Sequence, residues 1–407
     1  MNYIDKVRTV EKVYKRKPVL IVSAPGRADF LNTHQDYKGL PVVPVAINLR
    51  TYVFSLGAEK DKFIIDSLNL RKGGSRYRDK VPLKDISLVR GKWFGNYLRG
   101  VLLAFKEVFD FEPDKGLRIV IYSDVPIGSG LASSAALEVA FGKMLDEFYG
   151  LKLSPKDLAE ACFYAENGIC KIPCGRLDQY SAAFGEAILL YPKPPVKVEK
   201  LPLKGLKLVV ADSGIRHSVA DIHPRRQSEI NRGLQELLSM PDVPERVKEK
   251  LAPRFDEVSW EELSLEELSP FLQRIDGTSA KRIEFTFLMN NYTMKAVELI
   301  KESGGRLSPS LLKQIGEIMN KEHELLRDLY DVSLPELERI RNKMLEGGAL
   351  GVKLSGAGMG GSLIALVEDN ETGRRVANKA LEGGARKTWI VSVDEGARKE
   401  IYAPAHQ

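Results

Sequence analysis

The sequence contains little cysteine, and the few cysteines lie close together. Cys162, Cys170 and Cys174 are the only three among 407 residues, and no histidine lies near them. A structural zinc site usually takes four ligands in paired spacing, and an odd number of cysteines argues against a disulfide framework. We therefore interpret the three as small packing residues.

Long apolar runs are also missing. No run approaches the roughly 20 residues that cross a bilayer. The first residues, MNYIDKVRTVEKVYKRK, lack the apolar segment of a signal peptide. The sequence therefore predicts a cytoplasmic protein with no membrane partner.

No strong excess of one charge is present. Lys and Arg number 61 and Asp and Glu number 55, so the net charge is +6, and the two signs are mixed along the chain. A mild surplus of this kind indicates a solvated surface rather than a basic stripe for nucleic acid. No nucleic-acid partner is expected.

Strand and helix patterns are mixed along the chain without strict alternation. Short apolar runs predict strands at 18–23, 41–48, 117–125 and 206–214. Apolar residues at helical spacing predict helices at 96–111, 134–149, 155–168, 223–239, 279–303, 309–329 and 334–348. A chain of this length is too long for one ordinary core. The sequence therefore predicts an α+β protein with two sheets and two domains, 1–203 and 204–407, which meet near the proline-rich stretch at 192–205.

A glycine-rich segment, VPIGSGLASSAALEVA at 125–140, follows a predicted strand and opens a predicted helix. Gly128 and Gly130 let the backbone approach a ligand closely, and a helix N-terminus offers unpaired N–H groups to an anion. Ser133 and Ser134 add hydroxyls that suit phosphate or Mg²⁺. A plain helix cap with a tight turn is the alternative. The segment matches neither a Walker A loop nor G-x-G-x-x-G.

Three motifs resemble those of a known family. PIGSGLASSAA is similar to the phosphate loop of the GHMP small-molecule kinases. PGRADFLNTHQDYKG at 25–39 resembles the first motif of the galactokinase branch, PGRxNLIGEHTDYxxG, and KLSGAGMGG at 353–361 resembles the third, glycine-rich motif. Further matches, in the same order as in the family, are WFGNYLRGV (93–101), ENGICKIPCGRLDQYSAAFG (166–185), IRHSVADIHPRRQ (215–227) and HELLRDLYDVSLPEL (323–337).

This resemblance implies a two-domain GHMP kinase fold with the active site in the cleft between the domains. The N-terminal domain would be ribosomal-protein-S5-domain-2-like and the C-terminal domain ferredoxin-like, and the last strand could return to the first domain. The implied activity is a sugar 1-kinase that uses ATP with Mg²⁺ and gives the sugar 1-phosphate. Its implied partners are ATP and a small sugar, and its implied state is a monomer or a homodimer.

The resemblance also implies residue roles. Asp178 matches the aspartate beside the anomeric hydroxyl, where it either accepts the proton or orients the hydroxyl, and Arg27 matches the arginine that keeps this aspartate ionised. Ser134 and Glu166 match the residues that hold Mg²⁺. Trp93 matches a tryptophan near the adenine, with a buried core tryptophan as the alternative. The residues expected to bind ATP are Trp93, Gly128, Ser129, Gly130, Leu131, Ala132, Ser133, Ser134, Gly356 and Gly358.

The sugar-binding residues depart from the galactokinase pattern. They are Thr33, His34, Asp36, Asp178 and His223. Thr33 replaces a glutamate that lies near the C6 hydroxyl in the family, and Asn32 replaces a glycine. His223-Pro224, followed by Arg225 and Arg226, stands where the family has a tyrosine, and a cation there would suit an anionic sugar. The arginines alternatively only cover a helix surface.

These departures leave the sugar open. A galactose-type sugar is the main expectation, and a uronic acid, a pentose such as arabinose or an N-acetylhexosamine are alternatives. A regulator that senses ATP and sugar without turnover is a further alternative, although the phosphate loop is full length. His34, Asp36 and the GRLDQ segment favour a sugar over the non-sugar alcohols of mevalonate or homoserine kinases.

Overall fold

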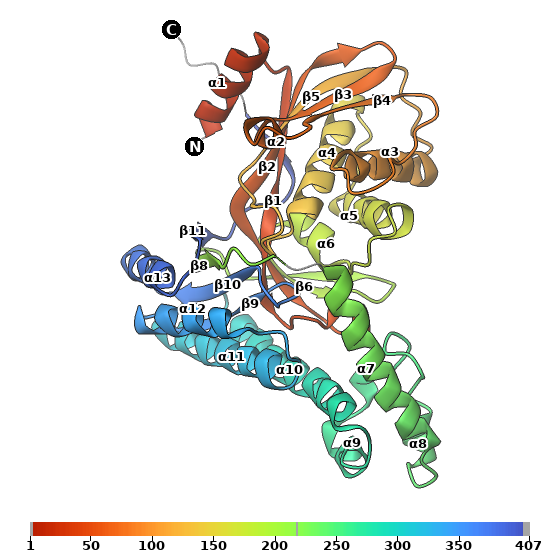
Figure 1. The fold of residues 1–407 in the computed structure, drawn as a ribbon, viewed down its shortest axis with the longest axis vertical. Helices are drawn as coiled ribbons and strands as arrows, with labels where there is room; N and C mark the ends of the chain where they lie inside the picture. Colours follow the sequence, from red (N-terminus) through yellow and green to blue (C-terminus); the bar gives the residue numbers. More distant parts are fainter. Residues whose placement is uncertain (1–2, 217–218, 402–407) are drawn as a thin grey trace.

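Two β-sheets organise the part of the chain that the computed structural model describes, residues 3–216 and 219–401 (Figure 1). The larger sheet has the order β12-β1-β2-β5-β3-β4, and β6 and β7 extend it from β2. The smaller sheet, β11-β8-β10-β9, is antiparallel. The strands of the larger sheet are β1 (Leu20–Leu31), β2 (Val43–Glu59), β3 (Lys62–Ser67), β4 (Arg78–Pro82), β5 (Gly116–Ser123), β6 (Ala187–Tyr191), β7 (Lys197–Leu201) and β12 (Arg398–Lys399). Those of the smaller sheet are β8 (Lys207–Asp212), β9 (Gly351–Ser355), β10 (Ser362–Val367) and β11 (Lys387–Ser392).

Helices cover both sheets. Figure 1 shows α3, α4 and α5 on one side of the larger sheet, α1 on the other side, and α10, α11 and α12 beside the smaller sheet. The helices of the first half are α1 (Tyr3–Tyr14), α2 (Leu68–Lys72), α3 (Gly95–Phe109), α4 (Ser133–Tyr149), α5 (Pro155–Phe163) and α6 (Leu177–Phe184). Those of the second half are α7 (Val219–Ser239), α8 (Glu245–Lys248), α9 (Leu265–Leu272), α10 (Gly277–Glu302), α11 (Pro309–Asp328), α12 (Pro335–Glu346) and α13 (Asn370–Glu382). Within the described ranges, none is both long and apolar enough to span a membrane.

The predicted α+β class and the main predicted helices are confirmed, and the local reasons hold where they can be checked. At the start of α5, the Ser154 hydroxyl accepts from the backbone N–H of Asp157 at 3.2 Å, and Pro155 occupies the first turn. The predicted helix at 155–168 is wrong in its second part, because α5 ends at Phe163 and a π-helix, Tyr164–Ile169, follows it.

The first strand differs from the prediction in a way that matters for function. The apolar run at 18–23 predicts a strand that ends before the polar motif, but β1 continues through that motif to Leu31. Ala28 and Phe30 are fully buried in one core, so their neighbours Arg27 and Asp29 face the other side of the sheet. Arg27 and Asp29 therefore sit on a rigid strand, whereas Thr33, His34 and Asp36 of the same motif lie in the turns that follow it.

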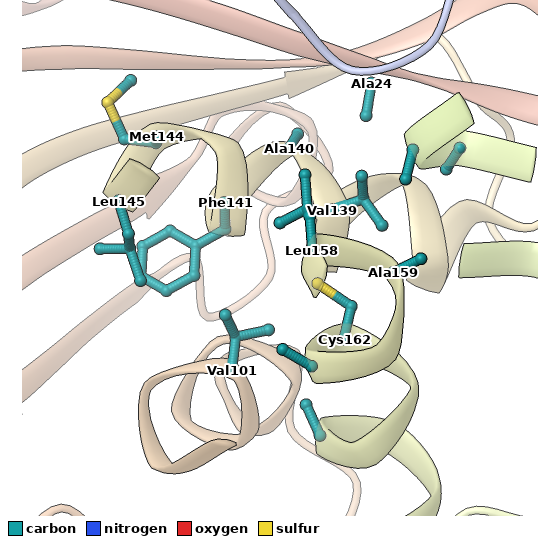
Figure 2. Packing of buried hydrophobic residues seen from close by; sticks show 14 of the residues in the cluster. Ala24, Val101, Val139, Ala140, Phe141, Met144, Leu145, Leu158, Ala159 and Cys162 are labelled. Atoms are coloured by element: carbon teal, nitrogen blue, oxygen red, sulfur yellow. The ribbon is translucent and has the colours of Figure 1, made fainter. Parts of the chain in front are cut away.

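One of the three cysteines packs in the helical layer that covers the larger sheet. Cys162 is fully buried with Val101, Phe141 and Leu158 from α3, α4 and α5 (Figure 2). All three cysteines are free. The interpretation as a packing residue is confirmed for Cys162, whereas Cys170 and Cys174 are partly exposed.

A second core joins the two halves of the chain. Phe30 and Val45 of the larger sheet belong to the same buried cluster as Leu208 and Ile364 of the smaller sheet. The chain changes from the larger to the smaller sheet between β7 and β8, and the predicted boundary at 203 lies in this connection. At its end the chain returns, because β12 pairs antiparallel with β1.

Candidate active site

A cavity of about 200 Å³ opens where β1, the glycine loop before α4, the start of α6 and the turn between β9 and β10 meet. It brings together residues that lie in five separate motifs of the sequence. The predicted site residues that line it are Arg27, Thr33, His34, Asp36, Gly128, Gly130, Ala132, Ser133, Ser134, Asp178, His223 and Gly356.

Three predicted residues shape the glycine turns instead of lining this cavity. The Ser129 hydroxyl donates to the carbonyl of Pro126 at 2.8 Å, and Leu131 is fully buried in the core shared by the sheets. Gly358 lies against the backbone of Val332, where a Cβ atom would stand 2.5 Å from the carbonyl oxygen. The Ser129 and Leu131 side chains therefore support the loops, and glycine at 358 permits a close backbone contact.

The centre of the cavity is an ion pair between β1 and the first turn of α6. Nε and Nη2 of Arg27 both lie 2.8 Å from Oδ1 of Asp178, and Nη1 donates to the carbonyl of Gly130 at 2.6 Å. Burial raises the pKa of Asp178, and the guanidinium opposes that rise. Because Arg27 contacts only Oδ1, the other carboxylate oxygen is the one that can accept a hydrogen bond from a substrate hydroxyl.

Asp36 adds another carboxylate to the cavity. It begins a short 3₁₀ turn, Asp36–Lys38, and a Cβ atom on Gly175 would stand 1.7 Å from its Oδ2. Glycine at 175 therefore permits this close contact. Burial, together with the charges of Asp29 and Asp178, raises the pKa of Asp36 to about 7.

Thr33 lies in front of a buried lysine. Nζ of Lys353, which is fully buried, donates to the Thr33 hydroxyl oxygen at 2.6 Å and to the carbonyl of Asp29 at 2.9 Å. The Thr33 hydroxyl lines the cavity, so it can donate to a ligand and can also accept through its second lone pair. Asn32 next to it has φ +65°, a left-handed conformation that glycine or asparagine adopts most readily, so this position tolerates the exchange of the family's glycine for asparagine.

Both ring nitrogens of His34 are used by the protein. Nε2 lies 3.0 Å from the carbonyl oxygen of Ala357, and Nδ1 lies 3.2 Å from the hydroxyl of Tyr37. A carbonyl only accepts, so Nε2 carries the proton and Nδ1 accepts from Tyr37. Burial holds the pKa of His34 well below its usual range. Although His34 lines the cavity, its hydrogen bonds join the first motif to the third rather than pointing to a substrate.

His223 brings no positive charge to the cavity at neutral pH. Its ring packs edge-on against His34 with 5.2 Å between ring centroids, and burial lowers its pKa to about 4. Arg225 and Arg226 both pair with Glu229, at 3.2 and 3.0 Å, and neither lines the cavity. The interpretation of Arg225 as a surface residue fits, while Arg226 is a buried structural residue. His217 and Ser218 of the same motif lie outside the described residues.

The two glycine turns touch each other above the cavity. Gly130 has φ +75°, and a Cβ atom there would stand 2.4 Å from the carbonyl oxygen of Ser355. The Ser355 hydroxyl also donates to the carbonyl of Gly130 at 3.2 Å. No side chain of the described residues caps α4. Its first N–H groups and its positive dipole end are therefore open to an anion beside these turns.

Ser134 and Glu166 lie next to each other at one side of the cavity. Glu166 belongs to the π-helix, and burial raises its pKa to about 7 while a hydrogen bond with the Ser134 side chain opposes the rise. The Gln179 amide donates to Glu166 at 2.6 Å and to Glu138 at 3.2 Å. In the described residues Oε1 of Glu138 is buried without a hydrogen-bond partner.

This donor set fits Mg²⁺ in the form in which kinases hold it. No cluster of three or more His, Cys, Asp or Glu side chains that could enclose a metal occurs in 3–216 and 219–401. Mg²⁺, however, usually binds through one or two carboxylates together with the phosphates of a substrate. Two buried carboxylates and a hydroxyl beside an open helix N-terminus meet that need.

A neighbouring cavity of about 150 Å³ shares Ser133 and Ser134 with the first and is otherwise mainly apolar, with Phe94, Tyr97 and Leu137 in its wall. It suits a flat apolar ring. Trp93 does not line this cavity, and its place near the adenine stays a prediction. Its ring lies 4.0 Å from the Arg76 guanidinium, and the next residue, Phe94, reaches the cavity instead.

Among the residues that the sequence interpretation missed are Asp29 and Phe94, which line these cavities, and Lys353, which lies behind Thr33. Asp29 stands two residues after Arg27, a spacing that signals the same face of a strand once the strand is known to continue. Lys353 begins the third motif, but nothing in the sequence shows that it reaches Thr33. Phe94 was hidden beside the larger Trp93.

Comparisons with known proteins agree with this arrangement. Residues 96–186 match the model of the GHMP kinases N terminal domain, 296–386 that of the GHMP kinases C terminal domain, and 11–55 the galactokinase galactose-binding signature. The galactokinase of Thermotoga maritima is 31% identical over 360 residues, which are 87% of this chain and 91% of that protein. The galactokinase of Clostridium acetobutylicum is 28% identical over 98% of this chain and 99% of its own.

Solved structures show the same similarity. The crystal structure of Lactococcus lactis galactokinase complexed with galactose has a TM-score of 0.80 and 25% identity, and covers 98% of this chain and 99% of its own. The mevalonate kinase of Methanococcus jannaschii, at 19% identity and a TM-score of 0.65, covers 92% and 98%, and shares the fold.

Proposed function

Because this chain belongs to the galactokinase family of the GHMP kinases, we propose that it transfers the γ-phosphoryl group of ATP to the anomeric hydroxyl of a galactose-type sugar. The observation that carries the proposal is the Arg27–Asp178 ion pair at the floor of the cavity, directly beside the glycine loop. A hydroxyl that contacts Asp178 would face phosphates held at the N-terminus of α4. The product is the sugar 1-phosphate.

The proposed roles follow from the contacts. Asp178 accepts a hydrogen bond from the attacking hydroxyl, and either takes its proton or orients it. Arg27 keeps Asp178 ionised and, beside the glycine loop, counters negative charge that develops on the transferred group. The backbone of Gly128 and Gly130 and the N–H groups of Ser133 and Ser134 hold the phosphates.

Ser134 and Glu166 would hold Mg²⁺, with Glu138 behind them. Mg²⁺ held there would neutralise negative charge on the phosphates. It would also supply the positive charge that two buried carboxylates need in order to remain ionised together. The apolar cavity at Phe94 would hold the adenine.

The electrostatics of the cavity bear on the choice of sugar. Three carboxylates line it, those of Asp29, Asp36 and Asp178, against the one lining guanidinium of Arg27. His34 and His223 are neutral at pH 7 because burial lowers the pKa of both. We therefore favour a neutral sugar over a uronic acid, and leave a pentose or an N-acetylhexosamine to the experiment.

The test is ATP-dependent phosphorylation across galactose, arabinose, N-acetylgalactosamine, galacturonate, glucuronate and glucose, with the product position read by NMR. We expect galactose 1-phosphate as the main product, and Asp178→Asn should abolish it while ATP still binds. If ATP and a sugar bind without turnover, the chain is a sensor rather than a kinase. Turnover only with a uronic acid would refute the electrostatic choice.

We also propose that the enzyme acts in the cytoplasm as a monomer or a homodimer, as its sequence and family resemblance imply. Light scattering after size exclusion distinguishes the two states from larger assemblies.

A further inference from the structure

One carboxylate oxygen in the cavity has no hydrogen-bond partner among the described residues. Asp29 is only 4% exposed, and its Oδ1 is buried without a hydrogen bond to any part of the chain that the structure describes. Its backbone is fully used, since its N–H donates to the Ser355 hydroxyl at 3.0 Å and its carbonyl accepts from Lys353 at 2.9 Å. A buried acceptor without a donor is costly, and more so when it is charged. Such a group is expected to meet its donor in a ligand.

The side chain of Asp29 lines the same cavity as Arg27. The two residues alternate along β1 with Ala28 and Phe30, which belong to the core on the opposite face. The charge of Asp29 also acts on the pKa values of Asp36, Asp178 and His223, which it raises. Asp29 therefore lies among the groups that surround the bound substrate rather than at the rim.

An aspartate at position 29 restricts the substrate group beside it more than the asparagine of the galactokinase motif does. The galactokinase motif given above has asparagine where this chain has Asp29, and an asparagine amide both donates and accepts. An ionised carboxylate only accepts, so it requires a donor on the substrate. Asp36 and Asp178 line the same cavity as Asp29, and their carboxylates together disfavour an additional anion.

We propose that Asp29 is a specificity-determining residue, which accepts a hydrogen bond from a hydroxyl or ammonium group of the sugar and rejects sugars that carry a carboxylate there. The inference rests on the proposed kinase function and deepens it. It assigns neutral and amino sugars as the substrate class. Both departures from the galactokinase motif, Asp29 and Thr33, would then contribute to sugar specificity.

The experiment compares wild type with Asp29→Asn, which keeps the shape of the side chain, and with Asp29→Ala. Asp110→Asn, an exposed position at the end of α3, is the matched control. Steady-state kinetics with galactose, galactosamine and galacturonate separate KM from kcat, and calorimetry measures sugar affinity without ATP. Thermal unfolding shows whether each variant folds.

For Asp29→Asn we expect the KM for galactose to rise by about tenfold or more, with kcat changed far less. The value of kcat/KM should fall most for galactosamine. The ratio of kcat/KM for galacturonate to that for galactose should rise by about tenfold or more. The Tm should be no lower than that of wild type, because the exchange removes a buried unpaired charge. A structural residue would instead lower the Tm and leave the sugar ratio unchanged.

Unchanged KM values and sugar ratios in both variants would overturn the inference. If wild type phosphorylates none of the sugars, the proposed function fails, and the calorimetric affinities decide the role of Asp29 separately. In that case equal affinity of wild type and Asp29→Asn for galactose and galactosamine would overturn it as well.

Discussion

The Arg27–Asp178 pair offers the sharpest test of the proposed chemistry, through the substitution Arg27→Met. Methionine fills much of the volume of the arginine side chain but provides no donor. It removes both contacts to Oδ1 of Asp178 at 2.8 Å and the hydrogen bond to the carbonyl of Gly130 at 2.6 Å. Asp178 would then be a buried carboxylate without its partner.

The magnitude follows from the geometry. At 2.8 Å and an effective dielectric constant of about 20, the attraction between the two charges is about 6 kcal/mol. Desolvation offsets part of it, and breaking a buried pair from one side typically costs about 3–5 kcal/mol. If this loss appears in the transition state, kcat/KM falls by about 10²–10³-fold or more, since about 1.4 kcal/mol corresponds to a factor of ten. Arg27→Lys keeps a charge but not the planar fork, so its loss should be smaller.

The same substitution should also change how kcat/KM depends on pH, in a direction set by the pKa of Asp178. Burial already raises the pKa of Asp178, and Arg27 opposes this rise. Removing Arg27 raises the pKa further, so more of the enzyme carries a protonated Asp178 at neutral pH. The acidic limb of the profile of log kcat/KM against pH should therefore move to higher pH, and the activity loss should be larger at pH 6 than at pH 9.

Two measurements check this reasoning. Initial rates of ATP-dependent sugar phosphorylation are recorded from pH 5 to 9 for wild type, Arg27→Met and Arg27→Lys. Arg225→Met on the exposed face of α7, whose partner is Glu229 at 3.2 Å, is the control and should stay within about twofold. A loss below tenfold for Arg27→Met, or an acidic limb that does not move, would refute the assigned role.

Three further predictions concern the surroundings of the cavity. Lys353→Met leaves Glu322 buried without its cation, which lies at 3.8 Å in the wild type. Urea denaturation should therefore show a free energy of unfolding lower by about 3–5 kcal/mol, and adding Glu322→Gln should restore part of it. A Lys353→Met variant as stable as wild type would contradict this prediction. Gly130→Ala puts a Cβ atom 2.4 Å from a backbone oxygen at a position with φ +75°, so kcat/KM should fall by about tenfold or more. Gly74→Ala, at φ +70° in open space, should leave kcat/KM unchanged. Equal effects of the two substitutions would show that only backbone strain matters. Asp36 has its pKa raised from 3.8 to about 7, so the folded state holds a proton that the unfolded state releases, and its contribution makes stability fall as pH rises between these values. Asp36→Asn should reduce that fall in unfolding experiments from pH 4 to 7, and an identical slope would count against the raised pKa.

Much of the site could be read from short segments of the sequence. The glycines at 128 and 130, the serines that open α4 and the Arg27 and Asp178 motifs are recognisable locally, because turn conformations, helix starts and ligand-binding loops depend on neighbouring residues. The cap at Ser154 and the helical periodicity of α3, α10 and α11 are local for the same reason. These features fixed the family and the expected catalytic pair.

The tertiary structure alone decided what each side chain is free to do. His34 was expected to bind the sugar, but Ala357, 323 residues further along, occupies its Nε2. Thr33 is held at the cavity by Lys353, 320 residues away in the chain, which donates to its hydroxyl oxygen. His223 is neutral because the packed rings around it remove water, and Trp93 turns to Arg76 while Phe94 reaches the apolar cavity.

Asp29 shows the division most clearly. Its residue type and its spacing from Arg27 are plain in the sequence, but its missing hydrogen-bond partner becomes visible only when every neighbour is in place. Whether a polar group is buried and hydrogen-bonded depends on contacts between segments that are distant in the sequence, so a local sequence pattern does not show it. The sequence by itself determined which chemistry this protein has at its disposal, and the packing of its two sheets decided which of those groups remain open to a substrate.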